Sequence, residues 1–323
     1  MRLPRRALIA FLAAVVTCNG GAALRAQQAA RSTVDGAKAL SDLQTLSSDA
    51  MEGRLTGTPG SAKARAFIVQ RFKDVGISPL GESYERTFTF RGRGNDADRT
   101  GTNILGVIRG TRDAAKFIVV TAHYDHLGVR NGQTFNGADD NASGVAALIA
   151  VAERLAADKP QHSILFAALD AEESGTNGAR ALLNDPPIAR EAIVMNVNID
   201  MVARDAGNVL FAVGTHHYPF LKAYLTDVAR PPVVLKFGHD APNAPGAKRD
   251  PATDDWTRDS DHYPFHAAGI PFIYFGVEDE EQHHKATDDF ETVTRELFVG
   301  AANTILAAIR KLDANLEAIA ARK

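Results

Sequence analysis

Cysteine is almost absent from this sequence, since Cys18 is the only one among 323 residues. It lies at the end of an apolar run near the N-terminus, and we expect it to leave with an export signal. The remaining chain would then have no disulfide, even in an oxidising compartment. A disulfide framework is therefore excluded, and stability must come from packing and from any bound metal ion.

The sequence also lacks an excess of charge of either sign. Its formal net charge is −3, and acidic and basic residues are mixed along the chain. No basic face is available to neutralise a phosphate backbone or an anionic bilayer. Nucleic acid is therefore excluded as a partner. The composition, 45% hydrophobic and 23% charged, also excludes disordered and fibrous proteins.

Long apolar runs of the kind that cross membranes are missing as well. The apolar run at residues 7–16 is too short for a mature membrane anchor, follows three arginines and precedes small residues that continue through Ala26. This pattern predicts a signal peptide at residues 1–26 and a periplasmic or extracellular protein without a transmembrane segment. Thr17 before Cys18 fits a lipoprotein signal poorly, so a lipid anchor at Cys18 is the lesser alternative.

Apolar periodicity predicts strands that alternate with helices. The predicted helices are residues 37–50, 61–75, 142–156, 178–183, 220–229 and 291–316. The predicted strands are residues 84–90, 103–108, 117–122, 163–169, 192–199, 209–213 and 271–275. Near-continuous apolar strands between helices indicate an α/β three-layer sandwich with a mixed, largely parallel central sheet. No repeat or linker divides residues 27–323, which are predicted to form a single domain.

One segment does not fit the alternation of strands and helices. Residues 237–261 contain three prolines, two glycines and six aspartates. We interpret this segment as a long surface loop, and long loops in compact domains are usually lids or binding loops.

Acidic and histidine side chains gather at the predicted ends of strands. In an open α/β sheet the carboxyl ends of the strands line one crevice, where ligands bind. We therefore expect the loops that follow these strands to converge on one acidic site. The residues at these positions are His123, Asp125, Asp139, Asp140, Glu172, Glu173, Asp200 and His284.

So many carboxylates in one cleft predict a bound cation, because neighbouring like charges cannot all remain ionised. Mixed nitrogen and oxygen donors suit zinc, or manganese or cobalt in its place, better than magnesium or calcium. One bridging carboxylate, two further ligands for each ion and a water between the ions would form a two-metal hydrolytic site.

Five short motifs in this order resemble the M28 family of co-catalytic zinc peptidases. The motifs are AHYD at 122–125, GADDNASG at 137–144, DAEESG at 170–175, NIDM at 198–201 and HKATD at 284–288. SDH at 260–262, AGIP at 268–271 and Gly53-Arg54 extend the resemblance. Each motif alone is weak, whereas all five in order are specific.

The resemblance implies a role for each motif residue. Asp140 would bridge two zinc ions, and its position three residues before Ser143 favours it over Asp139. The remaining ligands would be His123 and Asp200 for one ion, and Glu173 and His284 for the other. Glu172 would be the general base that takes a proton from the water between the ions and passes it to the leaving amine.

Two further residues receive expectations from their place beside the ligands. Asp125 is expected to accept a hydrogen bond from the free ring nitrogen of His123, and Asp288 to do the same for His284. His283 stands where several family members have a tyrosine, so it is a candidate oxyanion donor or substrate contact. A solvent-exposed His283 and an exchange of roles with His284 stay open. Asp261 and His262 are interpreted as structural or substrate-lining residues.

The resemblance favours an exported aminopeptidase that acts on peptides, because carboxylates around the metal ions can also bind a substrate's α-ammonium group. A carboxypeptidase or dipeptidase of the same family stays open, because loops outside the motifs define which peptide terminus is bound. A glutaminyl cyclase-like transferase, with one zinc ion, and a non-catalytic binding domain are the remaining alternatives. The preferred side chain, the native metal and the oligomeric state are not predicted.

Overall fold

The computed structural model describes residues 33–92, 97–242, 254–279 and 281–323. The expected signal peptide at 1–26, with Cys18, lies outside the described residues. So does the stretch 243–253 of the expected loop 237–261.

In the described part of the chain, nine strands form one mixed sheet. The strand order is β1-β3-β7-β4-β8-β11-β9-β10. Strand β2 is not part of this order and pairs with β3. The strands are β1 (Ser78–Pro79), β2 (Glu85–Arg91), β3 (Asp98–Ile108), β4 (Asp113–His123), β7 (His162–Leu169), β8 (Ile193–Ile199), β9 (Val209–Val213), β10 (Val234–Phe237) and β11 (Phe272–Gly276).

The centre of the sheet is parallel. β4 pairs in parallel with both β7 and β8, and β8 pairs in parallel with β11. The pairs β3 with β7 and β11 with β9 are antiparallel. Four neighbouring strands therefore have their carboxyl ends at the same edge of the sheet.

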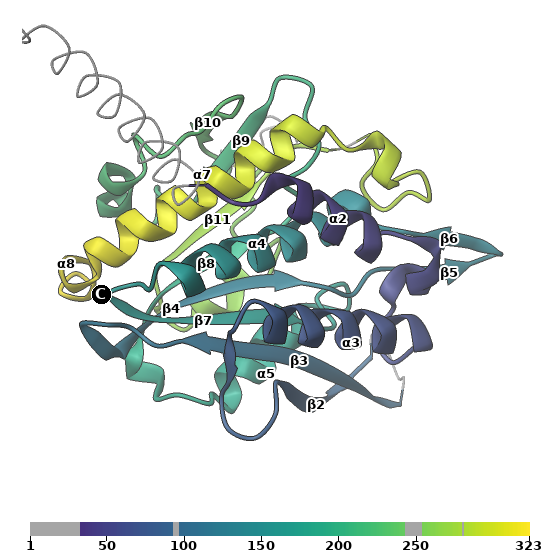
Figure 1. Ribbon diagram of the computed structural model, residues 1–323, viewed down its shortest axis with the longest axis horizontal. Helices are drawn as coiled ribbons and strands as arrows, with labels where there is room; N and C mark the ends of the chain where they lie inside the picture. Colours follow the sequence, from purple (N-terminus) through teal and green to yellow (C-terminus); the bar gives the residue numbers. More distant parts are fainter. Residues whose placement is uncertain (1–32, 93–96, 243–253, 280) are drawn as a thin grey trace, which may run out of the picture.

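Helices cover both faces of this sheet (Figure 1). Because side chains alternate between faces, Ile118 and Val120 of β4 belong to one hydrophobic core, whereas Phe117 and Val119 belong to another. Both faces are buried, which explains the near-continuous apolar strands. The first core includes α2 (Gly36–Leu46), α3 (Pro59–Asp74), α4 (Gly144–Ala157) and α7 (Arg295–Ala314), and the second includes α5 (Asn177–Asn184) and α6 (His262–Ala267).

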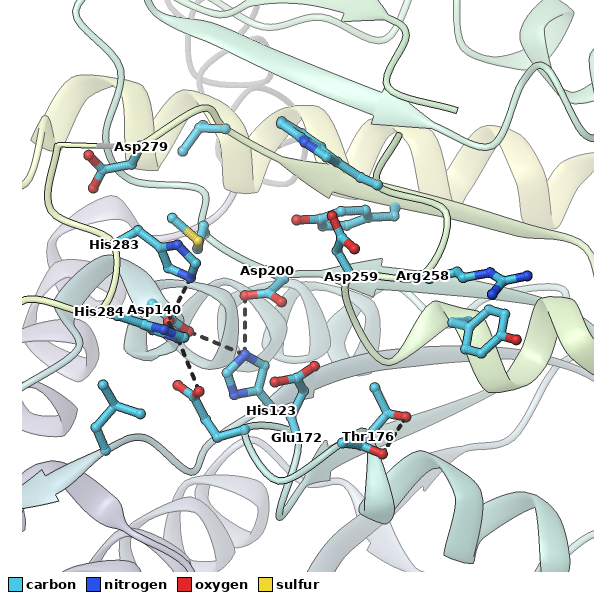
Figure 2. Close-up of a pocket in the computed structure, with 18 of the residues that line it drawn as sticks. His123, Asp140, Glu172, Thr176, Asp200, Arg258, Asp259, Asp279, His283 and His284 are labelled. Atoms are coloured by element: carbon cyan, nitrogen blue, oxygen red, sulfur yellow. Dashed lines mark hydrogen bonds and ion pairs between the residues drawn. The ribbon is translucent and has the colours of Figure 1, made fainter. Parts of the chain in front are cut away.

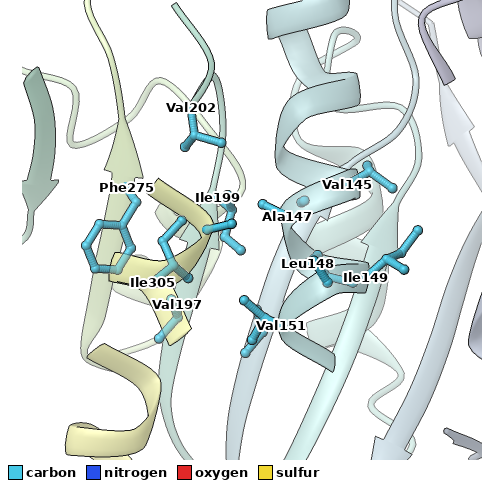
Figure 3. Packing of buried hydrophobic residues seen from close by; sticks show 14 of the residues in the cluster. Val145, Ala147, Leu148, Ile149, Val151, Val197, Ile199, Val202, Phe275 and Ile305 are labelled. Carbon is cyan, nitrogen blue, oxygen red and sulfur yellow. The ribbon is translucent and has the colours of Figure 1, made fainter. Parts of the chain in front are cut away.

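Helix α4 packs in the first core, where Figure 3 shows Ala147 and Val151 on the side toward β8, and Val145 and Ile149 on the other side. The irregular helical segment η2 (Ala138–Ser143) precedes it. The regular helix starts only at Gly144, where the backbone N–H of Gly144 donates to the Asn141 side chain at 2.8 Å. The predicted helix 142–156 therefore begins two residues too early. Asp139 and Asp140 lie in the irregular segment η2 that precedes the regular helix.

Three other helix predictions need correction. The helix expected at 37–50 ends at Leu46 and is followed by the short helix η1 (Asp49–Arg54). The helix expected at 220–229 is reduced to η4 (Pro219–Tyr224), where tight turns such as Leu225 N–H to the Lys222 carbonyl replace helical bonds. The last helix breaks at Asn315 and continues as α8 (Leu316–Ala320).

A few short elements were not predicted at all. The hairpin of β5 (Gly128–Arg130) and β6 (Gln133–Phe135) projects beyond the sheet between β4 and η2 (Figure 1). The 3-10 helix η3 (Arg190–Ala192) precedes β8, and η6 (Phe290–Thr292) takes up the start of the helix predicted at 291–316, so that α7 begins only at Arg295. Among the residues described, none of the helices combines the length and apolarity needed to cross a bilayer.

Candidate metal centre

The predicted site residues meet in one cleft at the carboxyl edge of the parallel strands (Figure 2). His123 ends β4, Glu172 and Glu173 follow β7, Asp200 follows β8, and His284 lies in the loop after β11. Asp140 comes from η2. All six line a cleft of about 790 Å³. The expected convergence of loops is therefore present in the structure.

The first cluster of donor atoms contains His123, Asp140 and Asp200. The Nε2 atom of His123 lies 3.4 Å from Oδ1 of Asp140 and 3.2 Å from Oδ1 of Asp200. Asp200 is held from behind by Ser260, whose hydroxyl donates to its Oδ2 at 2.6 Å. Ser260 in turn accepts a hydrogen bond from the Asn198 amide at 2.8 Å.

The second cluster shares Asp140 with the first. The Nε2 atom of His284 lies 3.2 Å from Oδ2 of Asp140 and 3.1 Å from Oε2 of Glu173. Asp140 thus presents one oxygen to His123 and the other to His284, which is the geometry of a bridging carboxylate. Asp139, its neighbour, instead accepts the backbone N–H of Ala203 at 2.7 Å.

These donor sets fit metal ions. Two donors about 2.0–2.1 Å from one tetrahedral zinc ion lie about 3.3 Å apart, close to the 3.1–3.4 Å separations within the two clusters. Among the described residues, three groups of possible donors lie within 4.8 Å of one another: His123, Asp140 and Asp200; Asp140, His283 and His284; and His126, Asp140 and Glu173. Nitrogen and oxygen donors in tetrahedral spacing suit zinc.

The pKa values of these side chains indicate that the carboxylates need positive charge nearby. Burial opposes ionisation of Asp140, yet His126, His284 and His123 pull the pKa of Asp140 well below its ordinary range. Hydrogen bonds to Asp140 and Glu173 raise the pKa of His284 to about 10. Positive charge close to these carboxylates therefore favours their ionised form, and bound cations can supply such charge.

Glu172 lies beside the clusters without joining them. It lines the cleft, and Figure 2 shows its side chain next to that of His123. Burial, opposed by His123 and reinforced by Asp261 and Asp200, raises the pKa of Glu172 well above its ordinary value. A carboxyl group with a raised pKa in a cleft is suited to proton transfer.

Asp125 has a different task from the one expected. Its carboxylate lies 3.7 Å from Nδ1 of His123, too far for a hydrogen bond, whereas its backbone carbonyl lies 3.1 Å from that nitrogen. The carboxylate instead accepts the backbone N–H groups of Glu172 at 3.0 Å and Glu173 at 3.3 Å. Asp125 therefore fixes the turn that points Glu172 and Glu173 in different directions.

Asp288 also departs from its expected role. Its carboxylate accepts the backbone N–H groups of Asp139 at 2.9 Å and Asp140 at 3.1 Å. It thereby anchors the segment that carries Asp140, rather than orienting the ring of His284.

The rings of His283 and His284 are in contact, with centroids 3.9 Å apart and planes tilted by 36°. The side chain of His283 is 49% exposed, and its Nε2 lies 3.7 Å from Oδ2 of Asp140. Because His284 is closer to Asp140 and also contacts Glu173, the geometry favours His284 over His283 as the donor. His283 lines the cleft, where it can meet a substrate.

Asp261 and His262 lie behind the cleft and do not line it. Asp261 is fully buried, and neither of its carboxylate oxygens has a hydrogen-bond partner among the described residues. Burial, opposed by His123, raises the pKa of Asp261 to about 7. His262 packs between Phe272 and Tyr274 and bonds to the Trp256 carbonyl at 3.0 Å. The structural interpretation of His262 fits this packing.

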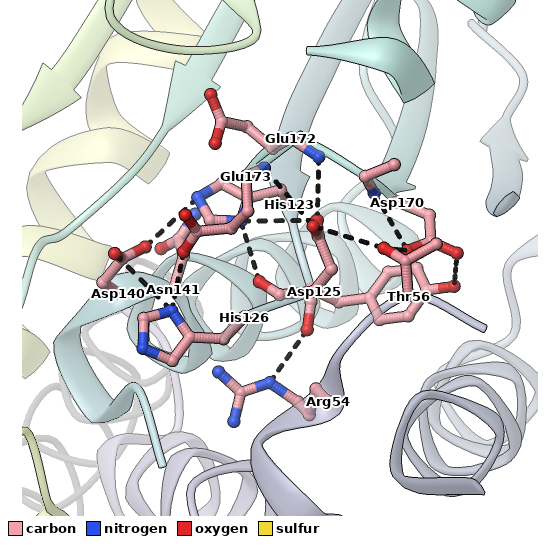
Figure 4. A network of polar contacts seen from close by, with 12 residues as sticks. Arg54, Thr56, His123, Asp125, His126, Asp140, Asn141, Asp170, Glu172 and Glu173 are labelled. Carbon is pink, nitrogen blue, oxygen red and sulfur yellow. Dashed lines mark hydrogen bonds and ion pairs between the residues drawn. The ribbon is translucent and has the colours of Figure 1, made fainter. Parts of the chain in front are cut away.

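Two buried residues at the site received no role from the sequence, although Arg54 belongs to a motif that extends the resemblance. His126 lies beside Glu173, with Nδ1 2.8 Å from Oε1. Arg54 is fully buried and donates to four backbone carbonyls at 2.6–2.9 Å, those of Leu46, Tyr124, Asn136 and Gly137. His126 follows directly after the AHYD motif at a strand end, and this position was the signal available for it. Figure 4 shows both in the polar network below the clusters.

The rest of the cleft has apolar, acidic and basic walls, and the basic residues are Arg130, Arg180 and Arg258. Trp256 comes from the described end of the segment 237–261, and it stacks on His239 with centroids 3.8 Å apart. The other apolar lining residues are Leu127, Met201, Tyr274 and Val277, and the acidic ones beyond the clusters and Glu172 are Asp254, Asp259, Glu278 and Asp279. The described end of this segment therefore contributes to the cleft, as expected for a binding loop.

A model of the family described as peptidase family M28 matches residues 103–309. Aminopeptidase YwaD of Bacillus subtilis (strain 168) is 28% identical over 223 residues, which are 66% of this chain and 45% of that protein. The chain spans only 26% to 60% of the length of the first three curated relatives that it matches.

Solved structures share the fold. A zinc aminopeptidase from Bacillus subtilis has a TM-score of 0.65 and 17% identity, covering 85% of this chain and 94% of that one. A glutaminyl cyclase from Fimbriiglobus ruber has a TM-score of 0.68 and 21% identity, covering 86% and 95%. At these identities the likeness shows the fold alone, and the fold is common to both activities.

Proposed function

The chain belongs to peptidase family M28, and we propose that it is a two-metal exopeptidase that releases residues from the N-termini of peptides. The observation that carries this proposal is the sharing of Asp140 between two clusters of donor atoms, with Glu172 beside them and outside both. A carboxylate shared between two donor clusters matches a two-metal hydrolytic centre.

Each ion would be held by one cluster. His123, Asp140 and Asp200 would bind one ion, and Asp140, Glu173 and His284 the other. Zinc fits the donors, and manganese or cobalt can replace it. When bound, the ions polarise the scissile carbonyl and lower the pKa of water in the cleft.

Glu172 would transfer the proton. Its carboxylate takes a proton from the attacking water and then gives it to the nitrogen of the leaving amine. Nearby cations would lower the pKa of Glu172 enough for it to be ionised before the reaction. Asp125, through the backbone N–H of Glu172, keeps this side chain directed into the cleft.

The walls of the cleft favour the N-terminus of a peptide. An α-ammonium group is positively charged, and eight carboxylates line the cleft against three arginines. Trp256 and Tyr274 offer an apolar surface to the side chain of the first residue. We therefore propose a preference for apolar first residues.

A panel of substrates tests the direction of cleavage. The pure protein, loaded with zinc, should release the anilide from leucyl- and phenylalanyl-p-nitroanilide and should not act on the N-acetylated forms. Peptides with an amidated C-terminus should be cleaved as well, because the C-terminal carboxylate is not needed. Cleavage of N-blocked peptides alone would assign the site to a carboxypeptidase.

The cyclase alternative is tested in the same assay. A peptide with N-terminal glutamine should lose that residue by hydrolysis in an aminopeptidase, whereas a cyclase would convert it to pyroglutamate with release of ammonia and no cleavage. Mass spectrometry separates the two products.

Export is a separate proposal, supported by the arginines and apolar run within residues 1–26. Expression of the full chain with a C-terminal tag, followed by cell fractionation and intact-mass measurement, should recover a shortened protein outside the cytoplasm. A full-length protein that stays in the cytoplasm would contradict this proposal.

A further inference from the structure

We propose that His126 is a positioning residue of the second donor cluster, whose imidazole donates a hydrogen bond to Oε1 of Glu173 and leaves Oε2 facing His284. The inference rests on the proposed two-metal function, and it adds a residue to which neither the family motifs nor the comparisons assign a role. Figure 4 shows His126 below Glu173.

The position of His126 is fixed by its surroundings. Its side chain is fully buried, and it lies in the segment between β4 and β5. A Cβ atom at Gly137 would lie 2.6 Å from the Cγ and Cδ2 atoms of the His126 ring, so the ring occupies space that only glycine leaves free. Gly137 has a φ of +54° and is held by Arg54, which donates to its carbonyl at 2.9 Å.

The distances identify His126 as a hydrogen-bond donor and not as a metal ligand. Within the two clusters, each histidine nitrogen lies 3.1–3.4 Å from the carboxylate oxygens with which it would share an ion. Nδ1 of His126 lies only 2.8 Å from Oε1 of Glu173, shorter than the separation of about 3.3 Å for two donors on one tetrahedral zinc ion. It is also 3.6 Å from Oδ2 of Asp140, the other atom that an ion in this cluster would need. A distance of 2.8 Å is typical of a charge-assisted hydrogen bond.

The direction of this hydrogen bond follows from the ionisation of Glu173. A carboxylate that binds a metal ion must be deprotonated. An ionised carboxylate only accepts hydrogen bonds. Nδ1 of His126 therefore carries the proton that is donated to Glu173.

The two oxygens of Glu173 are consequently divided between two histidines. Oε1 accepts from His126 at 2.8 Å, and Oε2 lies 3.1 Å from Nε2 of His284. A glutamate side chain has three rotatable bonds, so without His126 the carboxylate could turn away from His284. Groups that orient metal ligands typically change metal affinity 10–100-fold when they are removed.

Three variants test this role by metal binding. His126→Ala removes the donor. His126→Asn keeps one, because the amide nitrogen of asparagine can occupy nearly the same place as Nδ1 of histidine. His162→Ala is the matched control, since His162 is fully buried with Nδ1 2.9 Å from Asp313 and belongs to none of the clusters. Each metal-free protein is titrated with Zn²⁺ and Co²⁺ by calorimetry, and folding is checked by circular dichroism.

We expect two binding steps in the parent protein. His126→Ala should weaken the second step about 10–100-fold and leave the first unchanged. His126→Asn should stay within about threefold of the parent, with an unchanged visible spectrum of the Co²⁺ form, and His162→Ala should leave both steps unchanged.

Other outcomes would overturn the inference. If asparagine weakens the second step as strongly as alanine does, His126 is a ligand or a packing residue and not a donor to Glu173. If alanine leaves the second step unchanged, His126 has no role in the cluster. The titrations involve no peptide, so a failed peptidase assay would leave this result standing. A parent protein that binds one ion would contradict the two-metal proposal and this inference together.

Discussion

Replacement of Arg54 by methionine is the sharpest test of how the site is held together. Arg54 is fully buried, and burial, opposed by Asp140 and Asp288, lowers the pKa of its guanidinium to about 10, so it remains charged at neutral pH. Its four hydrogen bonds join the end of α2 to the loops that carry His126 and Gly137. The methionine side chain ends where arginine has Nε, and it has no hydrogen to donate.

The expected loss of stability follows from the carbonyls left behind. The Gly137 carbonyl also accepts from the Ala142 N–H. The carbonyls of Leu46, Tyr124 and Asn136 accept the other three hydrogen bonds from Arg54. Three buried carbonyls without partners cost at least about 1 kcal/mol each. Breaking a buried charged network costs up to about 5 kcal/mol. We therefore expect Arg54→Met to lower the free energy of unfolding by about 3–5 kcal/mol.

Urea unfolding of the zinc-loaded protein, followed by tryptophan fluorescence and circular dichroism, measures this difference. Arg54→Lys keeps the charge but cannot reach four carbonyls with one ammonium group, so we expect it to recover less than half of the loss. Arg86→Met is the control. Its exposed ion pair with Asp185 should contribute less than about 1 kcal/mol.

Two results would refute this reasoning. A loss below about 1 kcal/mol for Arg54→Met would show that the carbonyls find other partners. Full stability of Arg54→Lys would show that the charge matters and the planar guanidinium does not.

Three further predictions concern the cleft and its surroundings. Glu172→Gln should bind both metal ions normally and lose at least 100-fold in kcat, whereas loss of zinc in that variant would show that Glu172 is a ligand. Trp256→Ala should lower kcat/KM for phenylalanyl-p-nitroanilide by about tenfold more than for alanyl-p-nitroanilide, and an equal loss for both would contradict an apolar contact with the first side chain. Burial lowers the pKa of His262 to about 3, below its unfolded value of about 6.5, so its contribution to stability is lost as the pH falls between these values. The stability lost in His262→Phe, measured by urea unfolding of metal-free protein, should therefore shrink from pH 6.5 to pH 4, and a constant difference would contradict the shift.

The fold was largely predictable because its central strands are easy to recognise in the sequence. Both faces of the central sheet are buried, so β4, β7 and β8 are near-continuous apolar runs. The elements that were missed are short or irregular. Strand β10 alternates between partly buried and exposed residues. In η4, 3-10 turns replace the α-helix that the apolar periodicity predicts.

The six principal residues of the proposed site could be found because each follows a strand end or begins a helix. Their roles as ligands and base stay predictions, whereas their convergence is visible in the structure. No role was predicted for His126 or Arg54, because their motifs and positions do not reveal which distant groups they contact. Arg54 reaches carbonyls 70 to 83 residues away, and His126 reaches Glu173 47 residues away.

The sequence by itself determined the order of strands and helices and the presence of histidines and carboxylates at the strand ends. Periodicity and motif order are local properties, and parallel strands bring such ends to one edge. Only the tertiary structure decided the direction of each hydrogen bond. It turned Asp125 toward the backbone of Glu172 and away from the ring of His123. It also divided the two oxygens of Asp140 between two histidines, because those directions depend on packing between distant segments.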